Sequence, residues 1–256
     1  MKARIKSSQP KERIIAAAKR EFSELGFSGA RMSGIARRAS VNKALIHYYF
    51  KDKDTLYREV LKRIFTGTGA ASYLPDYFGK WELSPSQKLY ICIYFIVNIF
   101  LKATDPDALR IIFWEIAEGR KNLDTLVMEY NVPRQKVLAE VVREGIKKKE
   151  FESRYPLLSV MNIISFILIY IINREIYNGR SVFLEIYGDA DEKDVFEFVL
   201  DFVFKSLKPK NRGLEIPRIP DDLKTLLEEL LRVLIEKKDE GANEEIFKHI
   251  EHILKS

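Results

Sequence analysis

The segment NKALIHYYFKDK, residues 42–53, gathers side chains that can bind another molecule in a stretch too short to form a core of its own. A helix with 100° between successive residues places four of them within one arc of about 140°: Lys43, Ala44, His47 and Tyr48. Four others face the opposite way: Leu45, Ile46, Tyr49 and Phe50. The first face offers an ammonium, an imidazole and a hydroxyl beside an alanine that permits close approach. The pattern predicts an outward face that meets a partner and an inward face, with Ile46 and Phe50, that packs.

The charge of the chain is unevenly distributed around this segment. Residues 1–65 hold 16 lysines and arginines against 6 acidic residues, whereas residues 66–256 hold 27 against 31. A basic module joined to a mildly acidic body is typical of nucleic-acid binding through the basic part, and a basic surface without such a role is the alternative. The single cysteine, Cys92, excludes an internal disulfide and a cysteine-cluster metal site. No charged-then-apolar leader opens the chain, so we expect a cytoplasmic protein.

Short helices are expected to position the segment. Apolar residues recur at helical spacing over residues 11–25, and Gly26 is expected to end that helix. A second helix is expected over residues 33–39, after which Asn42 caps a third and Asp52 a fourth. Two helices separated by a tight turn, the second with a polar and aromatic outer face, describe a helix-turn-helix. The second helix of that motif enters the DNA major groove with its N-terminal residues on base edges.

The groups on the outward face suit double-stranded DNA. Lys43 can donate to O6 and N7 of guanine, and His47 can donate or accept. Tyr48 and Lys53 are placed to reach phosphates, and the N-terminus of the fourth helix adds backbone N–H groups that point at an anion. A helical subdomain with a purely structural role is the alternative.

The segment 35–61, IARRASVNKALIHYYFKDKDTLYREVL, resembles the DNA-binding module of TetR/AcrR-family transcriptional regulators. The matching positions are Phe22, Gly26-Phe27, Ile35-Ala36, Ala39, Val41, Tyr49-Phe50, Lys53 and Leu56. The resemblance is specific over about residues 11–64 and is only architectural beyond them. It implies base contacts by Lys43, Ala44 and His47. It also implies phosphate contacts by Tyr48, Tyr49 and Lys53.

Four features depart from the family pattern. Ser40 stands where glycine is usual in the turn, which strains a left-handed conformation if one is needed there. Arg31 replaces the usual threonine cap of the second helix and is assigned to a phosphate instead. His47 stands where tyrosine is common, which leaves open the base that it reads. The chain also continues for some 50 residues past Leu207, where such proteins typically stop.

The rest of the chain is also expected to be helical, which makes the protein all-α. Helices are predicted over residues 84–102, 105–119, 123–149, 156–178 and 191–207, followed by a proline-rich linker and two amphipathic helices. The expected domains are a basic arm (1–10) with Lys2, Arg4 and Lys6, the helix-turn-helix domain (11–65), a ligand-binding and dimerisation body (66–207), and a linker with a helical hairpin (208–256). The apolar run 156–173 is shorter than the ~20 residues of a membrane span and holds polar residues. We expect it in a subunit interface and not in a membrane, with a span as the alternative.

The family resemblance implies that the body binds a small molecule and forms a homodimer. The interface is expected from residues 156–178 and from a stripe on 194–207, comprising Val195, Val199, Phe202 and Val203. Pocket candidates are the rings and polar groups of the middle helices: Tyr90, Tyr94, Phe113, Trp114, Glu115, Tyr130 and Tyr170. Each of these is equally a residue of an ordinary core. The cavity is expected to be apolar with few polar anchors.

Enzymatic and metal chemistry have little support in the sequence. No nucleophile elbow, phosphate loop or supported carboxylate pair is present, so we expect no enzyme and no cofactor. His249 and His252 lie near Glu245 on a terminal helix, and a solvated face is expected there in place of a metal site. The sequence therefore predicts a homodimeric repressor that an apolar or amphipathic effector releases from a palindromic operator. The alternative is a protein–protein interaction module that keeps the DNA-binding fold and docks through the 220–255 hairpin.

Overall fold

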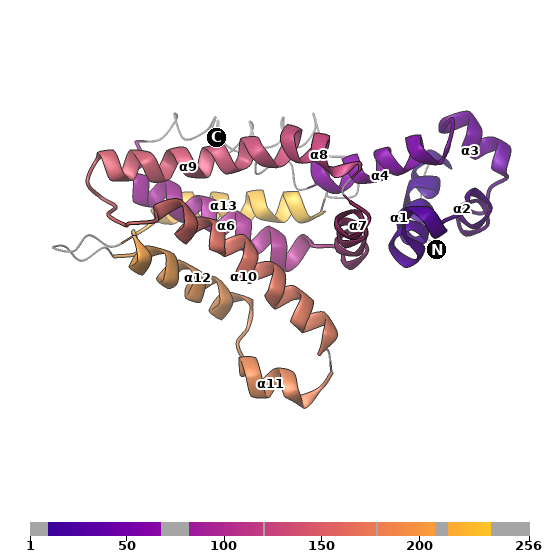
Figure 1. Cartoon of the computed structure of the whole chain (residues 1–256). Helices are drawn as coiled ribbons and strands as arrows, with labels where there is room; N and C mark the ends of the chain where they lie inside the picture. The colour runs from indigo at the N-terminus through magenta and orange to yellow at the C-terminus, as the bar shows by residue number, and fades with distance from the viewer. Residues whose placement is uncertain (1–9, 68–81, 120, 178, 208–214, 237–256) are drawn as a thin grey trace, which may run out of the picture. The chain divides into compact units, whose positions relative to one another are not determined.

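The computed structural model describes residues 10–67, 82–119, 121–177, 179–207 and 215–236. Every regular element in these ranges is a helix, which confirms the all-α prediction (Figure 1). The chain divides into two compact units, one made of residues up to Thr66 with Thr104–Asn131, the other of Gly67–Ala103 with the residues from Val132 onward. The body expected over residues 66–207 is therefore split, because residues 104–131 pack with the N-terminal helices.

The first unit contains the expected helix-turn-helix and a helix from later in the chain. Its elements are α1 (Pro10–Gly29), α2 (Met32–Ala39), α3 (Lys43–Tyr49), α4 (Lys53–Gly67), α7 (Pro106–Ala117), α8 (Leu123–Leu126) and the π-helical turn η2 (Val127–Asn131). Helix α1 packs against α2, α3 and α7. Phe22 and Tyr57 are buried at its centre with ring centroids 4.7 Å apart, and Ile14, Ile35 and Ile46 are fully buried around them. Burial of these apolar groups fixes the relative positions of the short helices.

Gly26 interrupts α1 as its sequence position predicts, although the helix resumes for one further turn to Gly29. Gly26 has φ 66° and ψ 177°, a backbone conformation that strongly favours glycine. A Cβ at this position would also lie 3.1 Å from Cδ2 of Trp114. The glycine thus serves both the bend of α1 and the close approach of α7.

The second unit is built around one central helix. Its elements are α6 (Pro85–Ala103), α9 (Val132–Lys147), α10 (Pro156–Ile176), α11 (Ser181–Tyr187), α12 (Glu192–Ser206) and α13 (Asp221–Glu236). Helix α6 contacts α9, α10, α12 and α13, which explains why its apolar residues extend around most of its circumference.

Two helix boundaries differ from the sequence expectation. The single helix expected over residues 123–149 is divided into α8, η2 and α9. Pro133 lies at the division, and proline lacks the N–H and crowds the carbonyl four residues earlier, so a regular α-helix cannot pass through it. The short helix α11 was not predicted, because seven residues are too few for a periodic pattern.

Helix α13, the first helix of the expected hairpin, packs on α6 of its own unit (Figure 1). Its apolar stripe is buried there and comprises Leu223, Leu227, Leu230, Leu231 and Val233. The second helix of the hairpin, with His249 and His252, lies outside the described residues, as does the N-terminal arm with Lys2, Arg4 and Lys6. Among the residues that are described, no group of three potential ligands could hold a metal ion.

Helices α10 and α12 pack against each other and carry large apolar side chains on their exposed sides. Val195, Val199 and Val203, expected in a subunit interface, are instead buried within the unit. The exposed apolar residues of the two helices are Leu158, Ile169, Ile176, Phe198 and Phe202. Among the described helices α10 alone, with mean hydropathy 2.0 over an 18-residue window, is by itself long and apolar enough to cross a membrane, and 28% of that window is buried inside the protein.

The buried thiol of Cys92 predicts a loss of stability in alkaline solution. Burial raises the pKa of Cys92 to about 12 from its ordinary 9.0. The native state therefore holds this proton more tightly than the unfolded chain does. The resulting contribution to the free energy of unfolding is complete below pH 9 and is lost as the pH rises toward 12. Between about pH 9 and 10 this thiol is expected to lower the free energy of unfolding by up to ~1.4 kcal/mol per pH unit, and half-buried Tyr94, whose pKa is also raised, adds to the decline as the pH approaches 10.

Urea unfolding of the whole chain between about pH 8 and 10 measures this decline. In Cys92→Ala the absolute stability changes because the cavity changes, so the slope against pH is the quantity to compare. A variant that keeps the slope of the unsubstituted protein contradicts the assignment to Cys92.

Candidate DNA-binding surface

The turn between α2 and α3 has the left-handed residue that the family pattern requires. Ser40 adopts φ 53° and ψ 48°, and its N–H donates to the carbonyl of Arg37 at 3.2 Å. The N–H of Val41 donates to the carbonyl of Ala36 at 3.0 Å, which closes the end of α2. The departure from glycine therefore leaves the turn intact, with a serine in the strained conformation.

Helix α3 is fixed by a cap and by two buried side chains. The side-chain oxygen of Asn42 accepts from the N–H of Leu45 at 2.7 Å, as its sequence position predicts. Ile46 and Phe50 are buried, which confirms their assignment to the inward face. Because both anchors lie on one side, the other side of α3 is presented to solvent.

The outward face of α3 contains the residues expected to contact bases. Lys43, Ala44 and His47 are exposed, and 80% of Tyr48 is accessible to solvent. Tyr49, which the helical wheel places on the inner side, is nevertheless 37% exposed and meets the ring of Tyr48 edge-on, with centroids 5.2 Å apart. The structure thus exposes four of these residues on one face of α3, with Tyr49 beside Tyr48 at the edge of that face.

Lys53, expected at a phosphate, makes its contacts inside the domain. Its Nζ donates to the carbonyl oxygens of Phe27 at 2.8 Å and Ala30 at 3.1 Å, and lies 4.4 Å from the centroid of the Phe27 ring. Phe27 lies in the last turn of α1 and Ala30 lies between α1 and α2. The ammonium therefore donates to carbonyl oxygens that have no acceptor role within a helix at this point. In this arrangement Lys53 positions the start of α2, a role that its sequence position did not reveal.

Replacing Lys53 by methionine is expected to lower the free energy of unfolding by about 1–3 kcal/mol, because two carbonyls lose their charged donor while the aliphatic stem stays. Denaturant titration of the variant measures the change, with Lys62→Met, at an exposed position of the same helix, as the matched control. Unchanged stability together with weakened DNA binding would instead assign Lys53 to phosphate contact alone.

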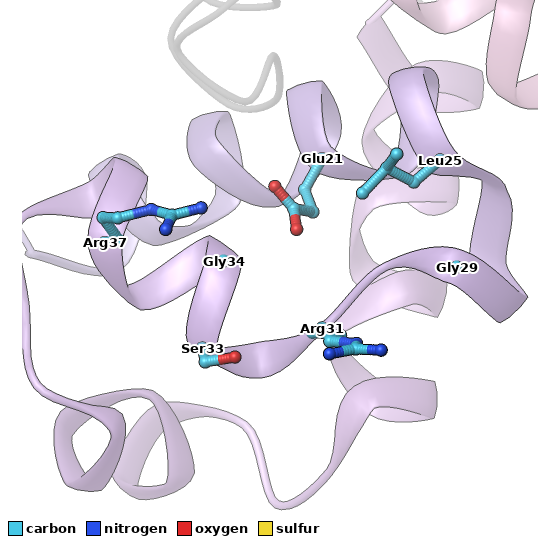
Figure 2. Close-up of a pocket in the computed structure, with 7 residues that line it drawn as sticks. All are labelled: Glu21, Leu25, Gly29, Arg31, Ser33, Gly34 and Arg37. Carbon is cyan, nitrogen blue, oxygen red and sulfur yellow. The ribbon is translucent and has the colours of Figure 1, made fainter.

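Arg31 lines an open hollow of about 440 Å³ between α1 and α2 (Figure 2). Ser33 and Arg37 of α2 line it as well, and the α1 side is formed by Glu21 and Leu25. The Arg31 side chain makes no cap hydrogen bond to α2 and is exposed, which leaves its guanidinium accessible for the phosphate contact predicted for it. Ser33 and Arg37, which sequence reasoning did not single out, line the same hollow because α2 packs on α1.

The carboxylate of Glu21 is buried beside this hollow and is neutralised within the domain. Nε of Arg38 donates to Glu21 at 2.7 Å, and the same guanidinium pairs with Glu24 through two donors. These two carboxylates raise the pKa of Arg38. Arg38 thus joins α2 to α1 and offsets the charge of Glu21, the carboxylate that lines the hollow.

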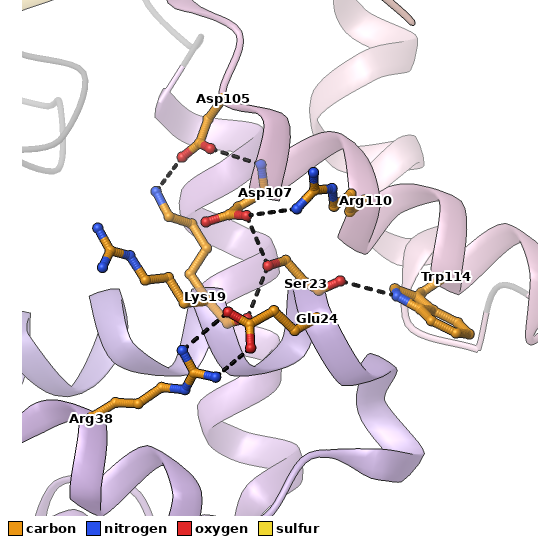
Figure 3. Close-up of polar contacts among 9 residues, drawn as sticks. Lys19, Ser23, Glu24, Arg38, Asp105, Asp107, Arg110 and Trp114 are labelled. Carbon is orange, nitrogen blue, oxygen red and sulfur yellow. Dashed lines mark hydrogen bonds and ion pairs between the residues drawn. The ribbon is translucent and has the colours of Figure 1, made fainter. Parts of the chain in front are cut away.

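Polar contacts attach α7 to α1 (Figure 3). Lys19 pairs with Asp105, and the hydroxyl of Ser23 donates to Asp107 at 2.9 Å. Nε1 of Trp114 donates to the carbonyl of Ser23 at 3.2 Å. Asp105 also caps α7 by accepting from the N–H of Asp107 at 2.9 Å, so the first turn of α7 is held both to itself and to α1.

The expected pocket residues are divided between the two units. Phe113, Trp114, Glu115 and Tyr130 belong to the first unit, whereas the second contains Tyr90, Tyr94 and Tyr170. Glu115 is buried and accepts from the backbone and side-chain nitrogens of Asn122 at 2.9 and 3.1 Å. It also bonds the hydroxyl of Tyr57, whose pKa is raised first by burial and then by this carboxylate.

In the second unit the tyrosines join aromatic clusters. The rings of Tyr90 and Tyr94 meet Phe196 edge-on, with centroids 5.8 and 5.6 Å apart. Tyr170 contacts Tyr187 at 5.4 Å and Phe183 at 6.1 Å. Burial raises the pKa of Tyr94 to about 12 and also raises that of Tyr90. Tyr90 and Tyr94 thus share one aromatic cluster, and Tyr170 belongs to another.

Comparison with known proteins matches the first unit to a family of regulators. Residues 14–60 match the family described as bacterial regulatory proteins, tetR family. The transcriptional regulator RutR of Escherichia coli is 44% identical over 57 residues, which cover 22% of this chain and only 27% of RutR. The transcriptional repressor SCO4008 of Streptomyces coelicolor is 29% identical over 152 residues, which cover 57% of this chain and 69% of that protein.

Solved structures extend the similarity of fold to both units. A tetR-family regulatory protein from Rhodococcus RHA1 has a TM-score of 0.59 at 14% identity and covers 80% of this chain and 100% of its own. SCO4942 from Streptomyces coelicolor has a TM-score of 0.54 at 22% identity and covers 78% of this chain and 98% of its own. The helix-turn-helix at residues 14–60 thus matches the tetR family of bacterial regulatory proteins, and the chain shares the fold of these solved structures over most of its length.

Proposed function

We propose that this protein is a dimeric transcriptional regulator that binds double-stranded operator DNA through α3 and releases it in response to a small-molecule effector. The observation that carries the proposal is the outward face of α3. Lys43, His47 and Tyr48 are exposed together on a helix whose other side is anchored in the core, directly after a left-handed turn at Ser40. In a helix-turn-helix this is the surface that reads base edges in the major groove.

The groups around α3 supply the phosphate contacts that such binding needs. Arg31 and Arg37 lie at the hollow between α1 and α2, and the carboxylate nearest to them is paired with Arg38. Tyr49 adds a hydroxyl at the end of α3. Phosphate contacts fix the register of a protein on DNA and make its affinity depend on salt.

A homodimer through α10 and α12 accounts for their exposed apolar residues. Leu158 and Ile169 are 67% and 57% exposed, and Phe198 and Phe202 are 53% and 43% exposed. Two copies of this surface packed across a two-fold axis would remove these side chains from water in a four-helix interface. The same axis relates two copies of α3, so the operator is expected to be palindromic with half-sites one DNA turn or a multiple apart. A dimer of this kind also accounts for the hydropathy of α10 without a membrane, in keeping with a cytoplasmic regulator.

An effector is proposed to bind the second unit and to act on the first through residues 104–131. This segment follows α6 and precedes α9 in the chain, and both helices belong to the second unit. It is fastened to α1 by Ser23 and to α4 by the bond between Glu115 and Tyr57. A change in the ends of α6 or α9 therefore reaches the DNA-binding domain through bonded contacts, and the coupling requires only differential effector affinity for two arrangements.

The aromatic clusters around Tyr90 and Tyr170 favour an apolar or amphipathic effector. The transcriptional regulator FadR from Bacillus subtilis, whose structure is in complex with stearoyl-CoA, has a similar fold with a TM-score of 0.50 at 21% identity. That protein illustrates that the fold accommodates a long acyl chain.

The rival function, a protein-interaction module that docks through the C-terminal hairpin, is less well supported. The apolar residues of α13 are already covered by α6, so this helix presents a mainly polar surface.

Selection from a random duplex library, followed by fluorescence anisotropy on the recovered duplex, tests the proposal. We expect a two-fold symmetric sequence and an affinity that falls with salt. The paired substitution Lys43→Ala and Tyr48→Ala is expected to weaken binding at least tenfold, since each removes a contact worth about 1 kcal/mol or more in each half-site. Lys193→Ala in α12, with its side chain 78% exposed, is the matched control. A failure to enrich any sequence, or equal binding by the paired variant, would refute the proposal.

A further inference from the structure

The imidazole of His47 is held in one orientation by the protein backbone. Its Nδ1 lies 3.1 Å from the carbonyl oxygen of Lys51, just beyond the end of α3. The N–H of Phe50 donates to the carbonyl of Ile46 at 2.7 Å, and the side chain of Phe50 is buried. The carbonyl of Lys51 therefore belongs to a well-anchored stretch, and the ring bonded to it cannot turn freely.

The contact with Lys51 determines which ring nitrogen carries the proton. A carbonyl oxygen only accepts hydrogen bonds, so Nδ1 must be the donor in this pair. A neutral imidazole has one N–H, and with that hydrogen on Nδ1 the other nitrogen, Nε2, bears a lone pair and acts solely as an acceptor. Within the described part of the chain, His47 makes no other hydrogen bond.

Nε2 of His47 belongs to the face of α3 that is proposed to enter the major groove. His47 is exposed and lies one helical turn from Lys43 and one position before Tyr48. Ala44 also lies on this face and has no side chain beyond Cβ that would keep a base edge away. In the neutral ring the group at this position is thus a hydrogen-bond acceptor, with a donor, the Lys43 ammonium, on the same face.

Base edges in the major groove offer few donors to such a group. The only hydrogen-bond donors there are the exocyclic amines, N6 of adenine and N4 of cytosine, whereas guanine and thymine present acceptors. We propose that His47 is a specificity-determining residue whose Nε2 accepts a hydrogen bond from the exocyclic amine of one adenine or cytosine in each half-site. The proposal rests on DNA binding through α3. A tyrosine hydroxyl, which both donates and accepts, could not discriminate in this way.

The tautomer can be measured without DNA. Long-range ¹⁵N–¹H correlation spectra at about pH 8 distinguish a protonated Nδ1 from a protonated Nε2 in a neutral ring. The chain has three histidines, and the signal lost in His47→Ala identifies the one in α3. A protonated Nδ1 is expected, and a protonated Nε2 would overturn the proposal.

The base contact is tested with duplexes that lack single amines. In the duplex recovered from the random library, each adenine is replaced in turn by purine, and each cytosine by pyrimidin-2-one, which remove N6 and N4. Removal of that amine from a single half-site is expected to weaken binding by the unsubstituted protein about fivefold to tenfold, the effect of one lost hydrogen bond. The variant His47→Ala is expected to bind the duplex that lacks this amine and the unmodified duplex with equal affinity.

The controls separate this proposal from DNA binding itself. Tyr48→Phe keeps His47 and is expected to keep the dependence on the amine, while circular dichroism verifies that His47→Ala is folded. The proposal is overturned if His47→Ala remains sensitive to the same amine. In a further set of duplexes each guanine is replaced by 7-deazaguanine, which lacks N7. The proposal is also overturned if the unsubstituted protein loses affinity for one of these duplexes while His47→Ala does not. If the protein binds a specific duplex but His47 is coupled neither to an amine nor to a guanine N7, the role of His47 is refuted and the proposed regulator function stands. If no specific duplex is recovered, both the role of His47 and the proposed function are refuted.

Discussion

An alanine at position 34 is expected to force α2 away from α1 and to lower the free energy of unfolding by about 2–4 kcal/mol. Gly34 is buried, and a Cβ there would lie 2.7 Å from Cδ of Glu21 and overlap its Oε1. The carboxylate cannot move aside without cost, because it is itself buried and bonded by Nε of Arg38 at 2.7 Å. Moving it strains the pair and exposes the core beneath.

The same substitution is expected to weaken DNA binding, because α2 positions the turn at Ser40 from which α3 begins. Denaturant titration and anisotropy on one preparation measure both effects. Gly29→Ala is the control, since a Cβ there meets only Cβ of Leu25 at 3.3 Å. In the background of Glu21→Ala the penalty of the alanine at position 34 is expected to shrink, and a penalty of the same size would show that the carboxylate is not the obstacle.

Removing the carboxylate of Glu115 is the second substitution with a large expected effect. Glu115→Ala is expected to lower the free energy of unfolding by about 2–4 kcal/mol, because three donors lose one shared, buried acceptor. Two of these donors are nitrogens of Asn122, and the third is the hydroxyl of Tyr57. The carboxylate thereby joins α7 both to the segment that follows it and to α4.

A double-mutant cycle of Glu115→Ala with Tyr57→Phe isolates the free energy of the interaction between these two side chains, which links α7 to α4. Tyr57→Phe alone is expected to lower the free energy of unfolding by about 1 kcal/mol, and a smaller loss is expected when Glu115 is already alanine. Glu118→Ala serves as the control, because it removes an exposed carboxylate at the C-terminal end of the same helix. If Glu115→Ala left stability unchanged while it weakened effector binding, Glu115 would be a pocket residue as the sequence suggested.

The helix-turn-helix and the outward face of α3 were predictable because they depend on short-range chemistry. The caps at Asn42 and Asp52 accept from backbone N–H groups three residues later, at 2.7 and 2.8 Å, and such contacts are encoded within a few positions. The split of the 43–50 segment follows from helical periodicity, and the burial of Ile46 and Phe50 agrees with it. Tyr49 was placed less well, because its position near the helix end lets packing decide its exposure.

The partners of charged and polar side chains were beyond the reach of the sequence. Lys53 looks like a phosphate ligand by its position, yet its ammonium is bonded to carbonyls of Phe27 and Ala30, more than 20 residues earlier. Glu115 and Trp114 looked like pocket residues, and they are engaged with Asn122 and with the carbonyl of Ser23. Nothing local in a sequence records such pairings, since they arise only when distant helices pack.

The sequence by itself therefore determined the helical class, the DNA-binding module and the outward face of α3, because periodicity, caps and turn residues act over one or two helical turns. Tertiary structure alone decided that residues 104–131 join the DNA-binding unit, that α13 covers α6, and that His47 has its Nδ1 committed to a backbone carbonyl. These outcomes depend on which surfaces bury one another, a property of the assembled chain. In the segment 42–53, the sequence alone left open whether His47 donates or accepts a hydrogen bond. The contact of its Nδ1 with the carbonyl of Lys51 leaves Nε2 of the neutral ring as an acceptor.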